Sequence, residues 1–233
     1  MTKALLDGDL FAYRTAAASE EADENICILR LDRFVRGVLH AVQSDTYEMF
    51  LTGDKNFRYE IFPDYKANRK DMVKPKWLSL CQEYLDKEWN AVRAHGCEVD
   101  DLLGMNQTDD TVICSIDKDM LMIPGKHYNF VREEHSIVTP EQGIRNFYEQ
   151  LLKGDTVDGI PGVRGLGKVK AAKLLANCET EKEMFDVARE QYNDDTTMAT
   201  YGKCLWIWRK QDDIWNMKDQ ITGRDLFDEE LQE

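Results

Sequence analysis

The chain has 233 residues, of which 42% are hydrophobic and 32% are charged, a balance that suits a folded globular protein and excludes wholesale disorder. Its net charge of −14 on its own disfavours a nucleic-acid partner. No apolar run approaches the ~18 residues of a membrane span, and Asp7 interrupts the start before a signal-peptide core can form. We therefore expect a cytoplasmic protein with no membrane partner.

Apolar periodicity divides the first 153 residues into alternating strands and helices. It predicts strands over 3–6, 47–51 and 111–116, paired strands over 127–138, and helices over 26–42, 75–85, 99–105 and 140–153. This alternation predicts an α/β fold around a mostly parallel sheet flanked by helices. Ligands of such a sheet bind outside the carboxyl ends of its strands.

The predicted secondary structure changes near Thr139 from alternating strands and helices to helices alone. From residue 154 a glycine-rich loop is followed by helical patterns only, so we expect a catalytic-type α/β domain over 1–139 and an all-helical region over 140–233.

The six cysteines have no C-x-x-C spacing, which gives no indication of a zinc site or a redox dithiol.

The charges are unevenly distributed along the chain. Residues 179–233 carry 15 acidic and 7 basic residues, whereas 55–76 carry 7 basic and 3 acidic residues. Residues 164–173 carry four basic residues and no acidic ones. Two basic patches are therefore available to an anionic partner despite the negative total.

Acidic residues follow the predicted strands. Asp7, Asp54 and the pair Asp117 and Asp119 stand at strand ends, and in an extended segment the pair shares one face. Glu98, Asp100 and Asp101 crowd the start of a helix. Parallel strands would bring these carboxylates to one crevice, where ionised together they need cations, and oxygen ligands favour Mg²⁺ or Mn²⁺.

A plainer interpretation exists for each acid taken singly. An aspartate after a strand is often a turn residue or a helix N-cap, and acids before an apolar run often only begin a helix. We expect Asp9 to be the N-cap of the helix through Phe11 and Tyr13 rather than a metal ligand.

The glycine-rich loop over 154–173 has the most specific pattern in the chain. Asp155 and Asp158 are spaced to reach a common cation. Glycines can bring the backbone close to a phosphate or turn carbonyls onto a monovalent ion, and the following helix points its amide end and its lysines at an anion. These residues are Gly162, Gly165, Gly167, Lys168, Lys170 and Lys173. The alternative is a plain glycine-rich turn before an exposed basic helix.

From residue 5 to about 175 these motifs resemble, in family order, those of the 5′-nucleases: flap endonucleases, bacteriophage 5′–3′ exonucleases and the 5′-nuclease domain of bacterial DNA polymerase I. The matching segments are 5–14, 53–54, 62–69, 98–101, 115–119 and 154–167. The resemblance implies a PIN-like α/β domain with an arch or gateway about 55–76. It also implies a C-terminal helix-three-turn-helix motif that grips duplex DNA and holds a potassium ion.

The resemblance further implies two divalent metal ions and a set of DNA contacts. The first ion would lie among Asp7, Asp54, Glu98, Asp100 and Asp117, and the second toward Asp119, Asp155 and Asp158, with Asp101 nearby. Lys66 and Arg69 would face the scissile phosphate, Tyr65 would stack on an unpaired base, and Arg14 would contact a phosphate. Asp7, Asp117, Lys66 and Arg69 would thus carry catalysis.

The implied activity is hydrolysis of phosphodiesters at 5′ ends, flaps or nicks of DNA during replication, repair or primer removal, by a monomer in a bacterial or phage-infected cell. Trp206, Trp208 and Trp215 are expected to pack in the core, the alternative being a contact surface for a replication protein on the acidic tail.

Three other functions compete with this one. A haloacid-dehalogenase-type phosphatase would use Asp7 and Asp9 with Asp155 and Asp158, but it needs the Gly154–Asp155 pair to follow a strand, whereas 140–153 is predicted to be helical. A DNA-junction binding protein without catalysis and a single-strand ribonuclease with the same core fold are the others.

Overall fold

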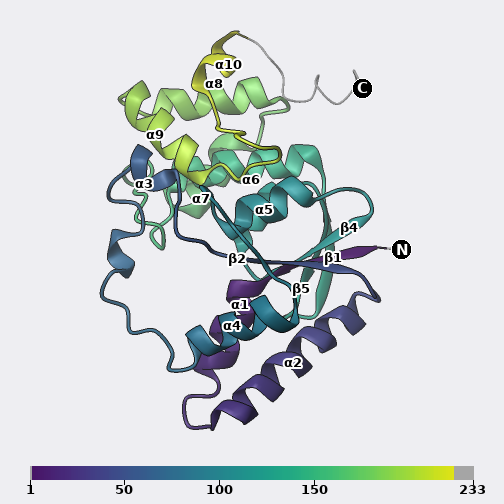
Figure 1. Ribbon diagram of the computed structural model, residues 1–233. Helices are drawn as coiled ribbons and strands as arrows, with labels where there is room; N and C mark the ends of the chain where they lie inside the picture. Colours follow the sequence, from purple (N-terminus) through teal and green to yellow (C-terminus); the bar gives the residue numbers. More distant parts are fainter. Residues whose placement is uncertain (1, 223–233) are drawn as a thin grey trace. The chain divides into compact units, whose positions relative to one another are not determined.

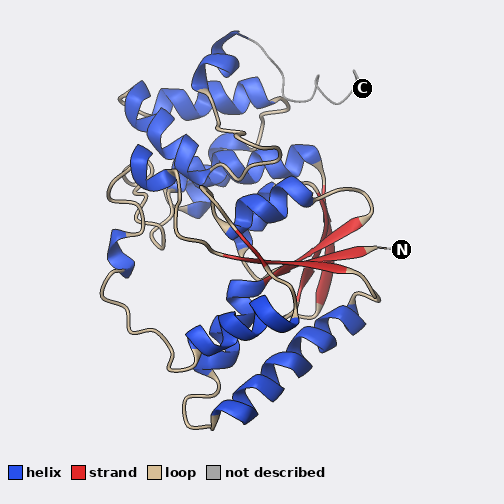
Figure 2. Cartoon of the chain, in the orientation of Figure 1, coloured by secondary structure: helices blue, strands red, loops and turns tan. Residues whose placement is uncertain are grey.

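The computed structural model of the protein describes residues 2–222. Six strands form one sheet in the order β3-β2-β1-β4-β5-β6 (Figure 2). All neighbouring strands are parallel except β5 and β6, which are antiparallel. The strands are β1 (Lys3–Asp7), β2 (Tyr47–Leu51), β3 (Val92–Arg93), β4 (Thr111–Cys114), β5 (Gly125–Asn129) and β6 (Glu134–Val138). The predicted mostly parallel sheet is confirmed.

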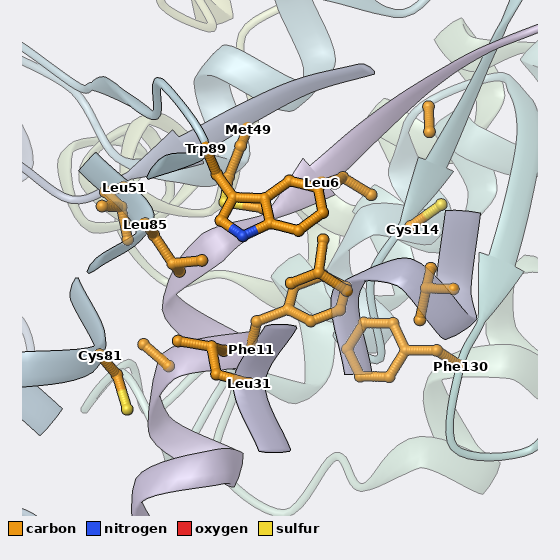
Figure 3. Close-up of a cluster of buried hydrophobic side chains, with 14 of the residues drawn as sticks. Leu6, Phe11, Leu31, Met49, Leu51, Cys81, Leu85, Trp89, Cys114 and Phe130 are labelled. Carbon is orange, nitrogen blue, oxygen red and sulfur yellow. The ribbon is translucent and has the colours of Figure 1, made fainter. Parts of the chain in front are cut away.

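Helices cover both faces of this sheet (Figure 1). One face carries α1 (Gly8–Ala17), α2 (Glu24–Ala41) and α4 (Leu78–Glu88), and the other carries α5 (Val99–Asn106) and the 3₁₀ helix η2 (Lys118–Met122). The alternation of side chains along a strand explains the division, because Ala4 and Leu6 of β1 enter the first core and Leu5 enters the second. Figure 3 shows the first core, in which Leu6, Phe11, Leu31, Met49, Leu85 and Trp89 meet.

The order of the strands reverses at β1. The chain goes from β1 to β2 and β3 on one side, and then continues with β4, β5 and β6 on the other side. In open α/β sheets the crevice at such a reversal is the preferred place for a ligand. Asp7 ends β1 at this point, and the residues after β4 lie beside it because Leu6 pairs with Cys114.

The chain forms two compact units, which are described separately. Within the described residues, the sheet unit consists of 2–56, 71–138 and 207–211, and the helical unit consists of 57–70, 139–206 and 212–222. Each unit thus takes a short segment from the other half of the chain. The end of the acidic tail, 223–233, for which a partner surface was considered, lies outside the described residues.

The helical unit is built on the predicted helix α6 (Pro140–Lys153). Thr139 and Gln142 form a reciprocal capping box at its start, and Gly154 ends it with a φ of 75°. The other helices are α3 (Arg58–Ile61), η1 (Ala67–Arg69), α7 (Lys168–Leu175), α8 (Glu181–Gln191), α9 (Asp195–Leu205) and α10 (Met217–Thr222). The expected all-helical character of this region is confirmed for 140–222, apart from one isolated bridge between Asp155 and Ile160.

Tryptophans fill the core of the helical unit. Phe147 of α6 contacts Trp206 and Trp215, with ring centroids 5.0 Å and 5.4 Å apart. Trp206, Trp215 and, in the sheet unit, Trp208 are all buried. The expectation that these three residues pack in the core is confirmed.

The segment 57–70 is more ordered than its polar composition suggests. It contains α3 and η1, neither of which the apolar pattern predicts. Arg58 of α3 is 2% exposed and donates to the carbonyls of Cys204 and Trp206, each at 2.8 Å. Among the described helices, none has the length and apolar character to cross a membrane.

Candidate active site

A carboxylate, a hydroxyl and a backbone amide are joined by hydrogen bonds where β1 and β4 end. Ser115 Oγ donates to Oδ2 of Asp7 at 2.9 Å and accepts from the amide of Asp117 at 3.1 Å. Asp7 and Ser115 are 108 positions apart in the chain. The parallel register of β1 and β4 brings them together, which confirms the expected proximity of Asp7 to Asp117.

Asp7 lies in an environment that disfavours its ionised form. Burial, the charge of Asp9 and the charge of Asp117 raise the pKa of Asp7 to about 7, while its hydrogen bonds from Ser115 and the amide of Leu10 act in the opposite direction. A buried carboxyl beside two further carboxylates is a place where a cation relieves repulsion. The chemistry of this donor set therefore fits a divalent metal ion.

Asp9 was expected to cap α1, and this expectation is wrong. The N-cap is Asp7, whose Oδ1 accepts from the amide of Leu10 at 3.2 Å. Asp9 lies in the first turn, where its two oxygens accept from the amide of Thr52 at 3.0 Å and from Nε2 of Gln82 at 3.1 Å. Asp9 thus ties α1 to the end of β2 and to α4.

Asp117 and Asp119 do not share the face of an extended segment. Asp117 is the N-cap of η2, and its Oδ1 accepts from the amide of Asp119 at 2.8 Å. Asp119 lies within the 3₁₀ helix, with Oδ1 3.4 Å from Nζ of Lys118. The chain turns directly after β4 because the Asp117 side chain caps the next element, so the prediction of a common face from a period of two is wrong.

Asp54 lies beyond the end of β2 and faces solvent. Its side chain is 78% exposed, and Oδ1 is 3.9 Å from Nδ1 of His95. A hollow of about 380 Å³ is lined here by Thr52, Gly53, Asp54, Arg93, Ala94 and His95. Asp54 is thus accessible to a ligand.

The three acids at the start of α5 have different environments. Glu98 and Asp101 form a capping box, in which Oδ2 of Asp101 accepts from the amide of Glu98 at 2.9 Å. Oδ1 of Asp101 accepts from the amide of Trp208 at 3.1 Å, and Asp101 is fully buried. Both oxygens of Asp101 thus accept from backbone amides, and its expected place near a metal ion stays a prediction. Glu98 and Asp100 remain half-buried.

Within residues 2–222, no three or more His, Cys, Asp or Glu side chains are close enough together to hold a metal ion. The carboxylates whose charges act on Asp7 are Asp9 and Asp117. The convergence of all the predicted metal ligands stays a prediction.

In the helical unit, Asp155 organises the glycine-rich loop. It is 4% exposed; Oδ1 accepts from the amides of Val157 and Asp158 at 2.8 and 3.3 Å, and Oδ2 accepts from Nε2 of Gln150 at 3.0 Å. Its carboxylate therefore shapes the turn, and its expected role as a metal ligand stays a prediction.

The glycines of this loop differ in their surroundings. Gly162 has a φ of 64°, and a Cβ there would lie 2.2 Å from the amide nitrogen of Gly154. The close approach expected between Gly162 and a phosphate is instead an approach to its own chain. At Gly165 and Gly167 a Cβ would meet no described atom within 4 Å, so these backbone positions are open.

Asp158 is the centre of an ion-pair cluster. Its Oδ1 lies 2.6 Å from Nη2 of Arg69 and 3.8 Å from Nζ of Lys66. Oδ2 accepts from the hydroxyl of Tyr65 at 3.0 Å. The predicted metal ligand is thus paired with both cations that were predicted to face the phosphate.

Tyr65 is 2% exposed, with its ring edge-on to Tyr59 and the ammonium of Lys66 over its face. A side chain with so little exposure offers no ring face to a base, so the expectation that Tyr65 stacks on an unpaired base is contradicted. The burial follows from the contacts of its ring and hydroxyl within the helical unit.

The basic residues of the first turns of α7 face solvent. Lys168, Lys170 and Lys173 are exposed, and Nζ of Lys170 donates to the carbonyl of Gly165 at 3.0 Å. Gly167 is the N-cap of α7. In the sheet unit, Arg14 near the end of α1 is also exposed. Each of these basic side chains is therefore accessible to an anion.

Sequence reasoning missed two residues that the structure makes important. One is Ser115, for which the available hint is its place near the end of the predicted strand, two residues before Asp117. Arg58 was counted in the basic patch of 55–76, yet it is buried in the helical unit. The apolar residues on both sides of Arg58, Phe57 and Tyr59, are the available hint of its burial.

Comparisons with known proteins agree with this architecture. Residues 2–149 match the family model described as "5'-3' exonuclease, N-terminal resolvase-like domain". A 5'-3' exonuclease of Buchnera aphidicola is 27% identical over 207 residues, covering 78% of this chain and 72% of that one. DNA polymerase I of Thermus thermophilus is 29% identical over 196 residues, covering 73% of this chain and 23% of the polymerase. The chain thus spans less than a quarter of that relative.

Solved structures share the fold. The bacteriophage T5 D15 protein crystallised with metal ions superposes with a TM-score of 0.67 at 14% identity, covering 98% of this chain and 96% of that one. The T5 D15 flap endonuclease in complex with DNA and metal ions gives a TM-score of 0.66 at 15% identity, covering 98% and 96%. The family model covers well over half of the chain, and the chain therefore belongs to the 5′–3′ exonuclease family of hydrolases.

Proposed function

We propose that the protein is a metal-dependent 5′-nuclease that hydrolyses phosphodiester bonds at or near the 5′ end of DNA, as a 5′–3′ exonuclease, a flap endonuclease or both. The observation that carries the proposal is the hydrogen-bonded chain from the amide of Asp117 through the Ser115 hydroxyl to the carboxylate of Asp7, at the reversal of strand order. Family membership supports the activity. The DNA complex of the T5 flap endonuclease, which shares the fold, supports DNA as the substrate.

The proposed cofactors are two divalent ions, Mg²⁺ or Mn²⁺, which when bound supply an activated water and neutralise the leaving oxygen. In the sheet unit the proposed ligands are Asp7, Asp54, Glu98, Asp100, Asp117 and Asp119. In the helical unit they are Asp155 and Asp158. Ser115 holds Asp7 by a hydrogen bond, so that one carboxylate is oriented before an ion arrives.

The basic residues are proposed to hold the nucleic acid. Lys66 and Arg69 would bind the scissile phosphate, and the planar guanidinium of Arg69 can donate to two oxygens at once. The lysines of α7 and the open backbone positions at Gly165 and Gly167 are proposed to bind an anion at the start of this helix, as part of a helix-three-turn-helix grip on duplex DNA. A potassium ion in the loop is part of the same proposal. Arg14 is proposed as a phosphate contact of the sheet unit.

The proposed setting is DNA replication, repair or primer removal by a monomer in the cytoplasm of a bacterial or phage-infected cell. Bacterial relatives named for 5'-3' exonuclease or DNA polymerase I support this setting. A replication protein that binds the acidic tail remains part of the proposal.

The haloacid-dehalogenase alternative is not supported, because Gly154 and Asp155 follow helix α6 and not a strand. A binding protein without catalysis would keep the same contacts, so only an assay separates the two functions. The ribonuclease alternative would act on single strands without using the basic start of α7.

The deciding experiment compares a 5′-labelled flap, a nicked duplex and a blunt duplex, each with Mg²⁺, Mn²⁺ or EDTA. We expect metal-dependent release of labelled 5′-terminal products from the flap or nick, and no cleavage in EDTA. Asp117→Asn should abolish cleavage while DNA binding in EDTA is kept. Asp110→Asn, the same change at the exposed opposite end of β4, should remain fully active. Binding without cleavage by the unaltered protein would leave only the junction-binding function.

A further inference from the structure

The carboxylate of Asp158 is paired with two cations inside the helical unit. The side chains of Lys66 and Asp158 are 15% and 16% exposed, and that of Arg69 is 40% exposed. At such low exposure solvent screens the charges less than on an open surface. In this arrangement the charges of Lys66 and Arg69 are directed to a carboxylate and not to a phosphate.

Backbone contacts fasten the same segment to the glycine-rich loop. The amide of Lys66 donates to the carbonyl of Asp158 at 2.8 Å, Nε of Arg69 donates to the carbonyl of Val157 at 3.1 Å, and Nδ2 of Asn68 donates to the carbonyl of Thr156 at 2.9 Å. Lys66 has a φ of 54°, a left-handed conformation that a lysine adopts only when its surroundings hold it. Together these contacts hold residues 65–69 against residues 156–158.

Two sets of partners compete for these charges. A divalent ion at Asp158 would stand beside two positive groups and repel them, so the ion pairs and an ion at this carboxylate exclude each other. A phosphate that approaches Lys66 and Arg69 likewise meets the negative charge of Asp158. An exchange of partners would resolve both conflicts: the carboxylate of Asp158 would hold a divalent ion, and Lys66 and Arg69 would bind a phosphate.

We propose that Asp158 is a positioning residue that keeps Lys66 and Arg69 from a phosphate until a divalent cation takes their place. This proposal rests on the proposed function, since it deepens the roles of Lys66 and Arg69 at the same site. It also gives the order of events, in which metal binding precedes capture of the scissile phosphate. A nuclease with this contact would hold its phosphate-binding groups closed in the absence of metal.

The test measures affinity for a 5′-phosphorylated oligonucleotide by fluorescence anisotropy in EDTA, where cleavage plays no part. Asp158→Asn removes the competing charge and should tighten binding about tenfold. Asp64→Asn is the matched control, because Asp64 is exposed on the same segment and forms no ion pair among the described contacts. An equal gain in both variants would reduce the effect to net charge and overturn the proposal.

The double variant Asp158→Asn/Arg69→Ala assigns the gain to the released arginine. Its affinity should be lower than that of Asp158→Asn alone and should keep only the part of the gain that the released Lys66 provides. A full gain that persists without Arg69 would show that Asp158 does not act through this residue, and the proposal would be wrong.

A measurement on the unaltered protein avoids any folding defect of the variants. Amide hydrogen exchange over 62–70 should become faster when Ca²⁺ or Mn²⁺ replaces EDTA, whereas exchange over α6 should stay unchanged. Unchanged exchange over 62–70 overturns the proposal. Cleavage of the flap substrate is measured in parallel. If the enzyme cleaves but exchange over 62–70 does not change with metal, only the proposed role of Asp158 is refuted. If exchange over 62–70 changes but the protein does not cleave, only the nuclease function is refuted.

Discussion

Ser115 donates its hydroxyl proton to Asp7 across the adjacent parallel strands β1 and β4, at 2.9 Å. The same hydroxyl accepts from the amide of Asp117. One small side chain therefore links the carboxylate of Asp7 to the backbone of Asp117, and both residues are proposed metal ligands. Groups that orient a metal ligand typically change metal affinity or activity by 10–100-fold when removed.

Ser115→Ala should weaken Mn²⁺ binding and cleavage by about 10–100-fold, because Asp7 loses the donor that fixes its orientation. The apparent metal affinity is measured by titrating cleavage with Mn²⁺ and by calorimetry with the protein alone. Ser136→Ala on the exposed β6 is the control and should leave both unchanged. An unaltered metal titration in Ser115→Ala would refute the orienting role.

Asp7 should make the metal-free protein less stable as the pH rises. Its pKa is raised from 3.8 to about 7, so the folded state binds more protons than the unfolded state between these pH values, and the free energy of unfolding falls as the pH rises through this window. The expected loss is on the order of 2–4 kcal/mol. Urea unfolding in EDTA at pH 5 and pH 8 measures it.

The variant Asp7→Asn removes the titrating group and should be stabilised relative to the unaltered protein at pH 8 much more than at pH 4. Addition of Mn²⁺ at pH 8 should stabilise the unaltered protein, because a metal ion favours the ionised carboxylate, and should stabilise Asp7→Asn less. Asp110→Asn is the control for loss of one charge. Identical pH profiles for Asp7→Asn and the unaltered protein would contradict the assignment of this window to Asp7.

Arg58→Ala should destabilise the protein strongly. The buried guanidinium donates to two backbone carbonyls, and its removal leaves the carbonyls of Cys204 and Trp206 without these donors. We expect a loss of about 3 kcal/mol in the free energy of unfolding. Arg33→Ala on the exposed face of α2 should change it by less than about 0.5 kcal/mol. Equal effects of both changes in urea unfolding would show that the Arg58 contacts contribute little.

Lys168→Ala should weaken binding to duplex DNA and reduce the slope of log affinity against log salt concentration by about 1, because one phosphate contact is lost. Anisotropy titrations in Ca²⁺ over a series of KCl concentrations measure the slope. Lys182→Ala removes the same charge from α8 and should leave the slope unchanged. A slope that Lys168→Ala does not alter would exclude the start of α7 from the DNA interface.

The elements of the fold follow from local patterns. The strand at 47–51 and the helix at 140–153 occur with the predicted bounds, because a short apolar run, a capping box and a proline at the first helical turn act over a few positions. The position of acidic residues at strand ends could likewise be predicted from the sequence, since the carboxyl ends of parallel strands lie at one edge of the sheet. The mostly parallel α/β fold and its family were therefore determined by the sequence.

The partners of individual side chains were decided only by the tertiary structure. Asp101 and Asp117 look alike in the sequence, yet Asp101 is buried against the amide of Trp208, 107 positions away, while Asp117 stays beside Asp7. Tyr65 and Asp158, 93 positions apart, pair with each other. Local periodicity specifies which face a residue occupies, but which distant group completes its hydrogen bonds depends on how the elements pack, and no short-range pattern encodes that choice.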